Sequence, residues 1–157
     1  MGENKSNIYK TVLISEEQKS KWISAGGDPN KSVIIPVPVE VPNYGLESYI
    51  KEFGWEDKFV FGMHQRDDIH IFSPVPLEAY DEIQSEDTAF LILGGSANHR
   101  KQAKDYQLKN VKFLDTTSDI SLIHKFLNTL DVYAHGRSDG EQCSSAIIEG
   151  LSHSLPM

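Results

Sequence analysis

The amino-acid sequence predicts an α/β fold, with a Rossmann-like parallel sheet flanked by helices. From residue 59 onward, short and nearly continuous apolar runs recur, as expected for strands that are buried on both faces. Helical patterns and short connections separate these runs, which favours parallel strands with helices on both faces of the sheet. The sheet is predicted to be incomplete, because the last residues, LSHSLPM, follow a helix where a doubly wound sheet would start another strand.

Four apolar runs are the predicted strands, and a helical pattern follows each of them. Before the first strand, a helix is predicted over residues 46–54, with Leu46 on its apolar face. The helix after the third strand is predicted to begin at an N-cap residue, Ser118 or Thr117. The predicted strands are FVFGM (59–63), AFLILGG (89–95), VKFLD (111–115) and DVYAH (131–135), and the helices between them span residues 74–84, 98–107 and 120–129.

The first part of the chain contains a separate set of elements. Residues 10–15 are predicted to form a strand and residues 16–27 a helix, with Ser15 as its N-cap and Gly26 as its stop signal. Residues 32–42 are rich in valine and isoleucine, but their three prolines exclude a central strand. This stretch is therefore predicted to be an edge strand or a linker.

The composition excludes several classes of protein. With 157 residues, 39% of them hydrophobic, the chain is long enough for one domain with a core. The formal net charge of -8 argues against a nucleic-acid partner, because phosphate-backbone binding depends on Lys and Arg. No apolar run reaches the roughly 18 residues of a membrane-spanning helix, and the single cysteine, Cys143, fits a reducing compartment. We therefore expect a cytoplasmic protein without an integral membrane segment.

Two loops at the carboxyl ends of the predicted strands contain candidate anion-binding groups, since ligands of open parallel sheets bind at that end. After the first strand, Arg66 is placed to reach a phosphate, and Ser73 as N-cap and Pro74 as first helical residue open a helix. Alternatively, Arg66 pairs with Asp67 or Asp68, and the Ser-Pro step only starts the helix. After the second strand, LGGSANHRKQA fits a tight turn better than a phosphate cradle.

The loop after the fourth strand, HGRSDGE, holds more ionisable groups than a structural turn requires. These are His135, Arg137, Asp139 and Glu141. The imidazole and the two carboxylates suit a divalent metal, although neighbouring loop residues rarely converge on one ion. The following helix start, CSS (143–145), offers a thiol and two hydroxyl nucleophiles, but the sequence has no G-x-S-x-G elbow.

Two glutamates bracket the last predicted helix. Ile147, Ile148 and Leu151 share one face of that helix and are predicted to face the core, whereas Glu149 lies far from this stripe. Eight residues at the helical rise separate Glu141 from Glu149 by about 12 Å, with unsatisfied backbone N–H groups between them. A ligand with hydroxylated rings at both ends and negative charge in the middle, such as a nucleotide sugar, fits this spacing. The alternative is an ordinary solvated polar face.

These segments together resemble the C-terminal, donor-binding domain of retaining glycosyltransferases with the GT-B fold, of the group 1 or glycogen-synthase-like superfamily. The stretch DVYAHGRSDGEQCSSAIIEGLSHSLPM is similar to that family's strand, acidic-glycine loop and helix, in which seven residues separate two glutamates. Residues 11–42 are similar to the end of the N-terminal domain and its linker. The resemblance implies that residues 1–45 are the tail of an acceptor domain plus a linker, and that residues 46–157 are a nucleotide-sugar-binding domain truncated before its last strands. The matching residues and motifs are Asp131, Gly140, Glu141, Glu149, Gly150, Leu151 and Pro156, with FGMHQR, LEAY, FLILGG and VKFLD upstream.

The resemblance also implies residue roles. Glu141 and Arg66 would be catalytic, with Glu141 at the hydroxyls of the transferred sugar and Arg66 at the diphosphate. Phe72 stands where the family usually has a lysine, so Ser73, or else His64, His70 or Arg137, would support the diphosphate. Glu149 would bind the ribose hydroxyls, and no obligatory metal or other cofactor is implied. The full set of implied donor-binding residues is Glu149, Gly140, Gln142, Cys143, Ser144, Ser145, Arg137 and Ser73.

The function implied is transfer of a sugar, of the hexosyltransferase class, from a nucleoside-diphosphate sugar to an acceptor with retention of configuration. The acceptor is a glycan, lipid or protein, and the piece alone is expected to lack the acceptor site. Partners implied are the nucleotide sugar and either a missing N-terminal domain or a homo-oligomer. Three alternatives stay open: a non-catalytic nucleotide-sugar-binding subunit, a sugar-nucleotide epimerase or phosphorylase of the same architecture, and a structural α/β domain.

Overall fold

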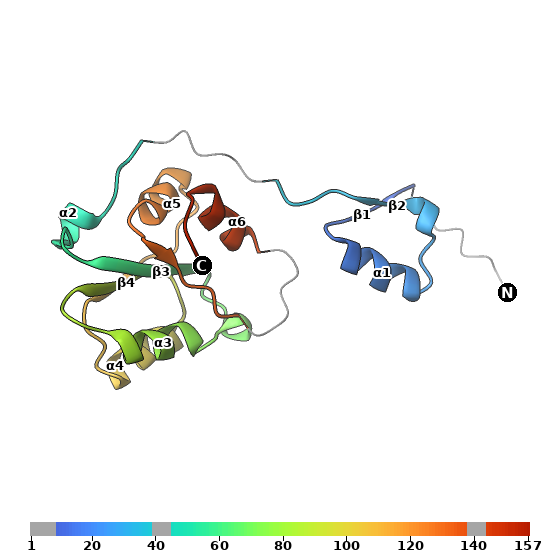
Figure 1. The fold of residues 1–157 in the computed structure, drawn as a ribbon. Coiled ribbons are helices and arrows are strands. Elements are labelled where there is room, and N and C mark those ends of the chain that lie inside the picture. Colours follow the sequence, from blue (N-terminus) through green and yellow to red (C-terminus); the bar gives the residue numbers. More distant parts are fainter. Residues whose placement is uncertain (1–8, 39–44, 138–143) are drawn as a thin grey trace. The chain divides into compact units, whose positions relative to one another are not determined.

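The computed structural model describes residues 9–38, 45–137 and 144–157, which belong to two compact units (Figure 1). The smaller unit includes residues 9–38, and the larger unit includes residues 45–137 and 146–157. The boundary at residue 45 between linker and donor domain stays a prediction.

The smaller unit is a β-α-β segment. Strands β1 (Thr11–Leu13) and β2 (Ser32–Ile34) pair in parallel, and helix α1 (Glu16–Ser24) connects them, with a short 3-10 turn η1 (Pro29–Lys31) before β2. Ser15 is the N-cap of α1, as predicted, because its hydroxyl accepts a hydrogen bond from the Gln18 N–H at 3.1 Å.

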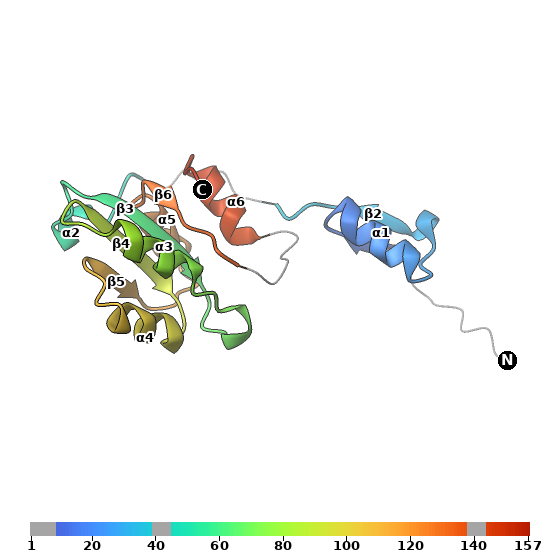
Figure 2. The same ribbon diagram turned by 60° about the horizontal axis from the view of Figure 1, so that its bottom comes forward.

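The larger unit contains a four-stranded parallel sheet with the order β5-β4-β3-β6, which confirms the predicted fold class (Figure 2). All four strands fall on the predicted apolar runs. Their bounds are Phe59–Gln65 for β3, Thr88–Gly94 for β4, Val111–Leu114 for β5 and Val132–Tyr133 for β6.

Helices cover both faces of this sheet, with α3 and α4 on one face and α5 and α6 on the other (Figure 1). Leu46, predicted to be helical, is instead exposed in a segment without regular secondary structure, and helix α2 begins only at Ile50. Thr129 accounts for the late start, because its hydroxyl accepts a hydrogen bond from the Tyr49 N–H at 2.9 Å. The helices are α2 (Ile50–Phe53), α3 (Val75–Ile83), α4 (Ala97–Asp105), α5 (Ile120–Leu127) and α6 (Ser145–Ser152), with a 3-10 turn η2 (Ile69–Ile71) after β3.

The core consists of two apolar layers, one on each face of the sheet. Strand β4 contributes to both layers because side chains alternate along a strand. Ala89, Leu91 and Leu93 pack with α5, whereas Phe90 and Ile92 pack with α3. The apolar run of β4 thus reflects burial on both faces, as predicted.

Two helix details differ from the prediction. The N-cap of α5 is Asp119, whose carboxylate accepts from the Ser121 N–H at 2.9 Å; neither Ser118 nor Thr117 caps the helix. Leu151 is 58% exposed, although the α6 periodicity placed it in the core. Gly150 faces the sheet instead, because its missing side chain lets the helix approach the Tyr133 ring, which lies 3.2 Å from where a Cβ would stand.

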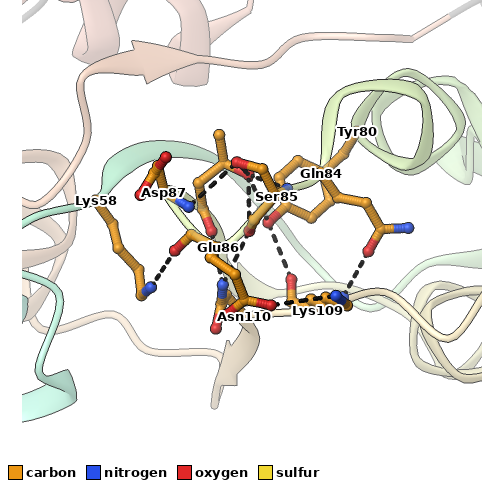
Figure 3. Close-up of polar contacts among 9 residues, drawn as sticks. Lys58, Tyr80, Gln84, Ser85, Glu86, Asp87, Lys109 and Asn110 are labelled. Atoms are coloured by element: carbon orange, nitrogen blue, oxygen red, sulfur yellow. Dashed lines mark hydrogen bonds and ion pairs between the residues drawn. The ribbon is translucent and has the colours of Figure 1, made fainter.

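A hydrogen-bond network joins the amino ends of the strands (Figure 3). The Asn110 side chain donates to the carbonyl oxygens of Ser85 at 3.2 Å and Thr88 at 2.9 Å. The buried Tyr80 donates its hydroxyl proton to the Lys109 carbonyl at 2.9 Å, and burial raises the pKa of this phenol. This network fixes the start of β4 against the start of β5.

Candidate functional site

The strand order places a reversal between β3 and β6. From β3 the chain proceeds to β4 and β5 on one side of the sheet, and then crosses back to β6 on the other side of β3. The connections after β3 and β6 therefore diverge at their carboxyl ends, which is where open α/β sheets bind ligands. The geometry alone thus selects the segments that follow Gln65 and Tyr133.

A histidine and a glutamate meet at this reversal. His64 comes from the end of β3, and Glu149 comes from α6, the helix that follows β6. The His64 Nε2 atom lies 2.7 Å from the Glu149 Oε2 atom. The Glu149 side chain is 37% exposed and the His64 side chain only 14% exposed. The carboxylate is therefore held from the protein side and remains accessible from the solvent side.

The His64 ring is fixed by two buried aromatic side chains. It packs edge-on against Phe126 of α5 and Tyr133 of β6, with ring centroids 5.7 Å and 5.4 Å away. Its Nδ1 atom is buried and has no hydrogen-bond partner among the described residues. The ring therefore points one nitrogen into the core and the other at Glu149.

Helix α6 has a second polar attachment next to Glu149. The His153 Nε2 atom lies 2.8 Å from the His124 Nδ1 atom of α5, and the two rings stack. The His153 Nδ1 atom lies 3.0 Å from the backbone carbonyl oxygen of Glu149. After α6, the chain returns to β6, where Leu155 is buried and the Pro156 carbonyl accepts from the Tyr133 N–H at 2.9 Å. The backbone around Glu149 is therefore anchored on both sides.

Arg66 lies just after β3 and is engaged within its own loop. One guanidinium nitrogen is 3.4 Å from the Asp68 Oδ2 atom, and the Arg66 side chain is 72% exposed. Pairing with Asp68 was the alternative to a phosphate-binding role. Ion pairs at such exposure are weak, about 0 to 1 kcal/mol, so the pair leaves Arg66 able to change partner.

The start of α3 is shifted by one residue from the prediction. Pro74, not Ser73, is the N-cap position, and no side chain caps the helix. Ser73 is buried, and its hydroxyl accepts from the Val75 N–H at 3.4 Å. Pro74 has helical φ and ψ, and its carbonyl accepts the first helical hydrogen bond, from the Glu78 N–H at 3.0 Å.

Two glycines bring the loop after β4 against the end of β3. Gly94 and Gly95 have φ of +79° and +74°, and the Gly95 N–H donates to the Gln65 carbonyl at 2.7 Å. A Cβ at position 94 would lie 2.3 Å from that carbonyl oxygen, so only glycine fits. This loop is the tight turn that the sequence indicated.

A buried histidine follows this turn in the first turn of α4. The Ser96 N–H donates to the His99 Nδ1 atom at 3.1 Å, so the proton of the neutral ring sits on Nε2. Burial lowers the pKa of His99, and the nearby Ser73 backbone and the Asp67 charge oppose this shift. Among the described residues, His99 Nε2 and Gln102 Oε1 are buried without a hydrogen-bond partner.

Several predicted site residues lie outside the described residues. These are Gly140, Glu141, Gln142 and Cys143, together with Asp139 of the metal alternative. Of the others, Arg137 is half-buried, Ser144 is buried and Ser145 is the exposed first residue of α6. Within residues 9–38, 45–137 and 144–157, no group of three or more His, Cys, Asp or Glu side chains is arranged to hold a metal ion.

The contact between His64 and Glu149 was not found from the sequence, where His64 figured only as a substitute diphosphate ligand. The alternation of side chains along β3 could have indicated this contact. Val60 packs in the layer beneath α5, and Met63 packs in the opposite layer. His64, four residues after Val60, therefore faces the α5 and α6 side.

Solved glycosyltransferase structures share this fold. The Anabaena protein Alr3699/HepE, solved in complex with UDP and glucose, matches with a TM-score of 0.76 and 17% identity, over 94% of this chain and 43% of that chain. WaaG, a glycosyltransferase involved in lipopolysaccharide biosynthesis, matches with a TM-score of 0.69 and 14% identity, over 94% and 43%. TarM matches with a TM-score of 0.65 and 15% identity, over 94% and 28%. No family model and no curated protein matches by sequence.

The fold is therefore that of the C-terminal half of GT-B glycosyltransferases, as predicted. The chain spans less than half the length of each of these three structures. None of the helices in the described part of the chain is long and apolar enough to span a membrane.

Proposed function

We propose that the chain is the donor-binding portion of a glycosyltransferase that uses a nucleoside-diphosphate sugar, retains the configuration of the sugar and has no obligatory metal. One observation carries the proposal. The accessible carboxylate of Glu149 is held at the β3–β6 reversal, in a fold that HepE shares and that in HepE was solved with UDP and glucose. Carboxylates suit a ribose, because each oxygen accepts hydroxyl hydrogen bonds.

Each polar group then has a separate task. Glu149 accepts hydrogen bonds from the ribose hydroxyls, and Glu141 accepts them from the transferred sugar. Arg66 balances the diphosphate charge that grows as the leaving group departs. Its pair with Asp68 can be exchanged for a diphosphate, because the Arg66 side chain is 72% exposed and ion pairs of such side chains are weak. Backbone N–H groups of residues 140–145 complete the donor site.

The acceptor side belongs to the whole protein rather than to this chain. Because the chain covers 43% of HepE, we place the acceptor site, for a glycan, lipid or protein, outside residues 1–157. Product analysis with an isotopically labelled donor separates this reaction from its relatives. Transfer to an acceptor or to water supports the proposal, whereas an epimerised donor contradicts it.

Ligand-induced stabilisation is the first test. UDP, GDP and ADP, each free and as a sugar conjugate, are added at millimolar concentration while thermal unfolding is followed. A ligand present at 100 times its Kd stabilises the native state by about 2.7 kcal/mol, which raises the melting temperature by several degrees. An unchanged melting temperature with all of these ligands would contradict the proposal and favour a structural domain.

A further inference from the structure

We propose that His64 is a positioning residue for Glu149: it donates one hydrogen bond to Oε2 and so presents the carboxylate to the ribose in a single orientation. The inference rests on the proposed function and deepens it. Its basis is the pairing of a fixed ring at the end of β3 with a partly exposed side chain on α6, at the reversal point of the sheet.

The direction of the hydrogen bond follows from the chemistry of the pair. An ionised carboxylate only accepts hydrogen bonds, so the proton between the two groups belongs to His64 Nε2. The other ring nitrogen, Nδ1, is buried without a partner among the described residues. A lone pair is tolerated there better than a second N–H, because a buried, uncompensated donor on a charged ring is costly. The arrangement therefore favours a proton on Nε2 and a lone pair on Nδ1.

The ring is a rigid donor. His64 belongs to β3 and pairs in register with Leu93 of β4, so its backbone is fixed by the sheet. Phe126 and Tyr133 hold the ring edge-on from two sides. The Tyr133 hydroxyl also lies 3.4 Å from both the backbone N and the backbone O of His64. The backbone and the ring of His64 are therefore both held in place.

Glu149 by contrast would be mobile without this contact. Its side chain is long and 37% exposed, and the described residues supply one hydrogen-bond partner for its carboxylate, His64. Fixing Oε2 leaves Oε1 for the ligand and removes the entropy loss that binding would otherwise require. His64 therefore acts on affinity through Glu149, without a contact of its own to the nucleotide.

The first experiment needs no ligand. Long-range proton–nitrogen NMR spectra of the 157-residue chain report which ring nitrogen of His64 is protonated. We expect Nε2 to carry the proton and to shift in Glu149→Ala, with the Nδ1 signal at the position of an unprotonated nitrogen. Protonation on Nδ1, or a His64 spectrum unchanged by Glu149→Ala, would overturn the inference whether or not a nucleotide binds.

The second experiment measures UDP affinity by calorimetry in a double-mutant cycle. His64→Leu keeps an apolar side chain against Phe126 and Tyr133 but removes the N–H that donates to Glu149. It should weaken UDP binding about five- to tenfold. His64→Gln places an amide N–H near the position of Nε2 and should restore most of that loss. In a Glu149→Ala background, His64→Leu should cause no further loss, because the two residues act as one unit.

The two proposals fail differently. If the wild-type chain does not bind UDP, UDP is not its ligand and that part of the proposed function is wrong. The NMR result still decides whether His64 donates its Nε2 proton to Glu149. Equal UDP affinities of wild type and His64→Leu, or an equal loss in the Glu149→Ala background, would reject the positioning role alone. Thermal unfolding of each variant shows whether a loss of affinity reflects a loss of folded protein.

Discussion

The two ends of the four-stranded sheet are built for different purposes. At the amino end, Asn110 and Tyr80 connect the starts of neighbouring strands through hydrogen bonds to backbone carbonyls (Figure 3). At the carboxyl end lie the three buried polar side-chain atoms that have no partner among the described residues: His64 Nδ1, His99 Nε2 and Gln102 Oε1. A buried polar atom without a partner lowers stability. We therefore expect such atoms at positions where the residue serves a functional site and not the stability of the fold.

This difference predicts a separation of effects. Substitutions at the amino end should lower the free energy of unfolding and leave nucleotide affinity unchanged. Substitutions at the carboxyl end should change affinity more than stability. Unfolding free energies and UDP affinities measured on the same variants test this separation.

Asn110→Ala should give the largest loss of stability. It removes two side-chain hydrogen bonds, at 3.2 Å and 2.9 Å, and places alanine at a φ of +54°. Two hydrogen bonds and one left-handed residue together cost about 2 to 3 kcal/mol. Urea unfolding measures the change. Asn110→Gly is the matched control, since glycine accepts the positive φ, and it should lose only the hydrogen-bond part. A large drop in UDP affinity in either variant would break the separation.

Gly150→Ala should lower stability by about 1 kcal/mol and also weaken nucleotide binding. A Cβ at this position would lie 3.2 Å from the Tyr133 ring, so the ring or α6 must give by a few tenths of an ångström. Because the ring is buried, we expect α6 to move, and Glu149 with it. The overpacking outweighs the gain in helix propensity from replacing glycine. Urea unfolding and UDP calorimetry measure the two effects. Leu151→Ala, at the neighbouring exposed position, should change neither by much, and equal effects at both positions would contradict this packing.

The pH dependence of stability should contain a contribution from His99. Its pKa is lowered by burial, so the native state disfavours the charged ring. Protonation of the unfolded chain then lowers stability as the pH falls below about 6.5, the ordinary histidine pKa, toward the lower pKa of the native state. His99→Gln should show a smaller loss of stability between pH 6.5 and 5 than wild type, in urea unfolding at a series of pH values. Identical pH profiles would show that His99 is not buried in its neutral form.

The layered fold could be predicted because it depends on local composition. Apolar runs such as AFLILGG are typical of strands buried on both faces, and the helical segments between the runs favour parallel pairing. The starts of helices were predicted less well. Leu46 satisfied the helical period, but Thr129, far along the chain, takes the Tyr49 N–H and delays the helix. Similarly, Leu151 lies on the apolar stripe, while Gly150 decides which face of α6 approaches the sheet.

The candidate site was predicted in part. Glu149 and Arg66 are named as site residues from their position after parallel strands and from the family resemblance, and their roles stay predictions. The pair formed by His64 and Glu149 was not predicted, because the two residues are 85 positions apart. Their contact depends on β6 lying next to β3, an arrangement that periodicity does not reveal. Glu141 lies outside the described residues, so its role stays a prediction.

The UDP affinity of Glu149→Ala, compared with that of wild type, decides whether Glu149 belongs to a nucleotide site. Glu149 is proposed to contact the ribose, which every nucleotide and nucleotide sugar contains, so its loss should reduce affinity at least about 100-fold, or about 2.7 kcal/mol. Glu141→Ala should lose less, since UDP lacks the sugar. Glu82→Ala, at an exposed position of α3, is the control and should bind like wild type. Equal UDP affinities of wild type and Glu149→Ala in calorimetry would contradict the assignment of the donor site.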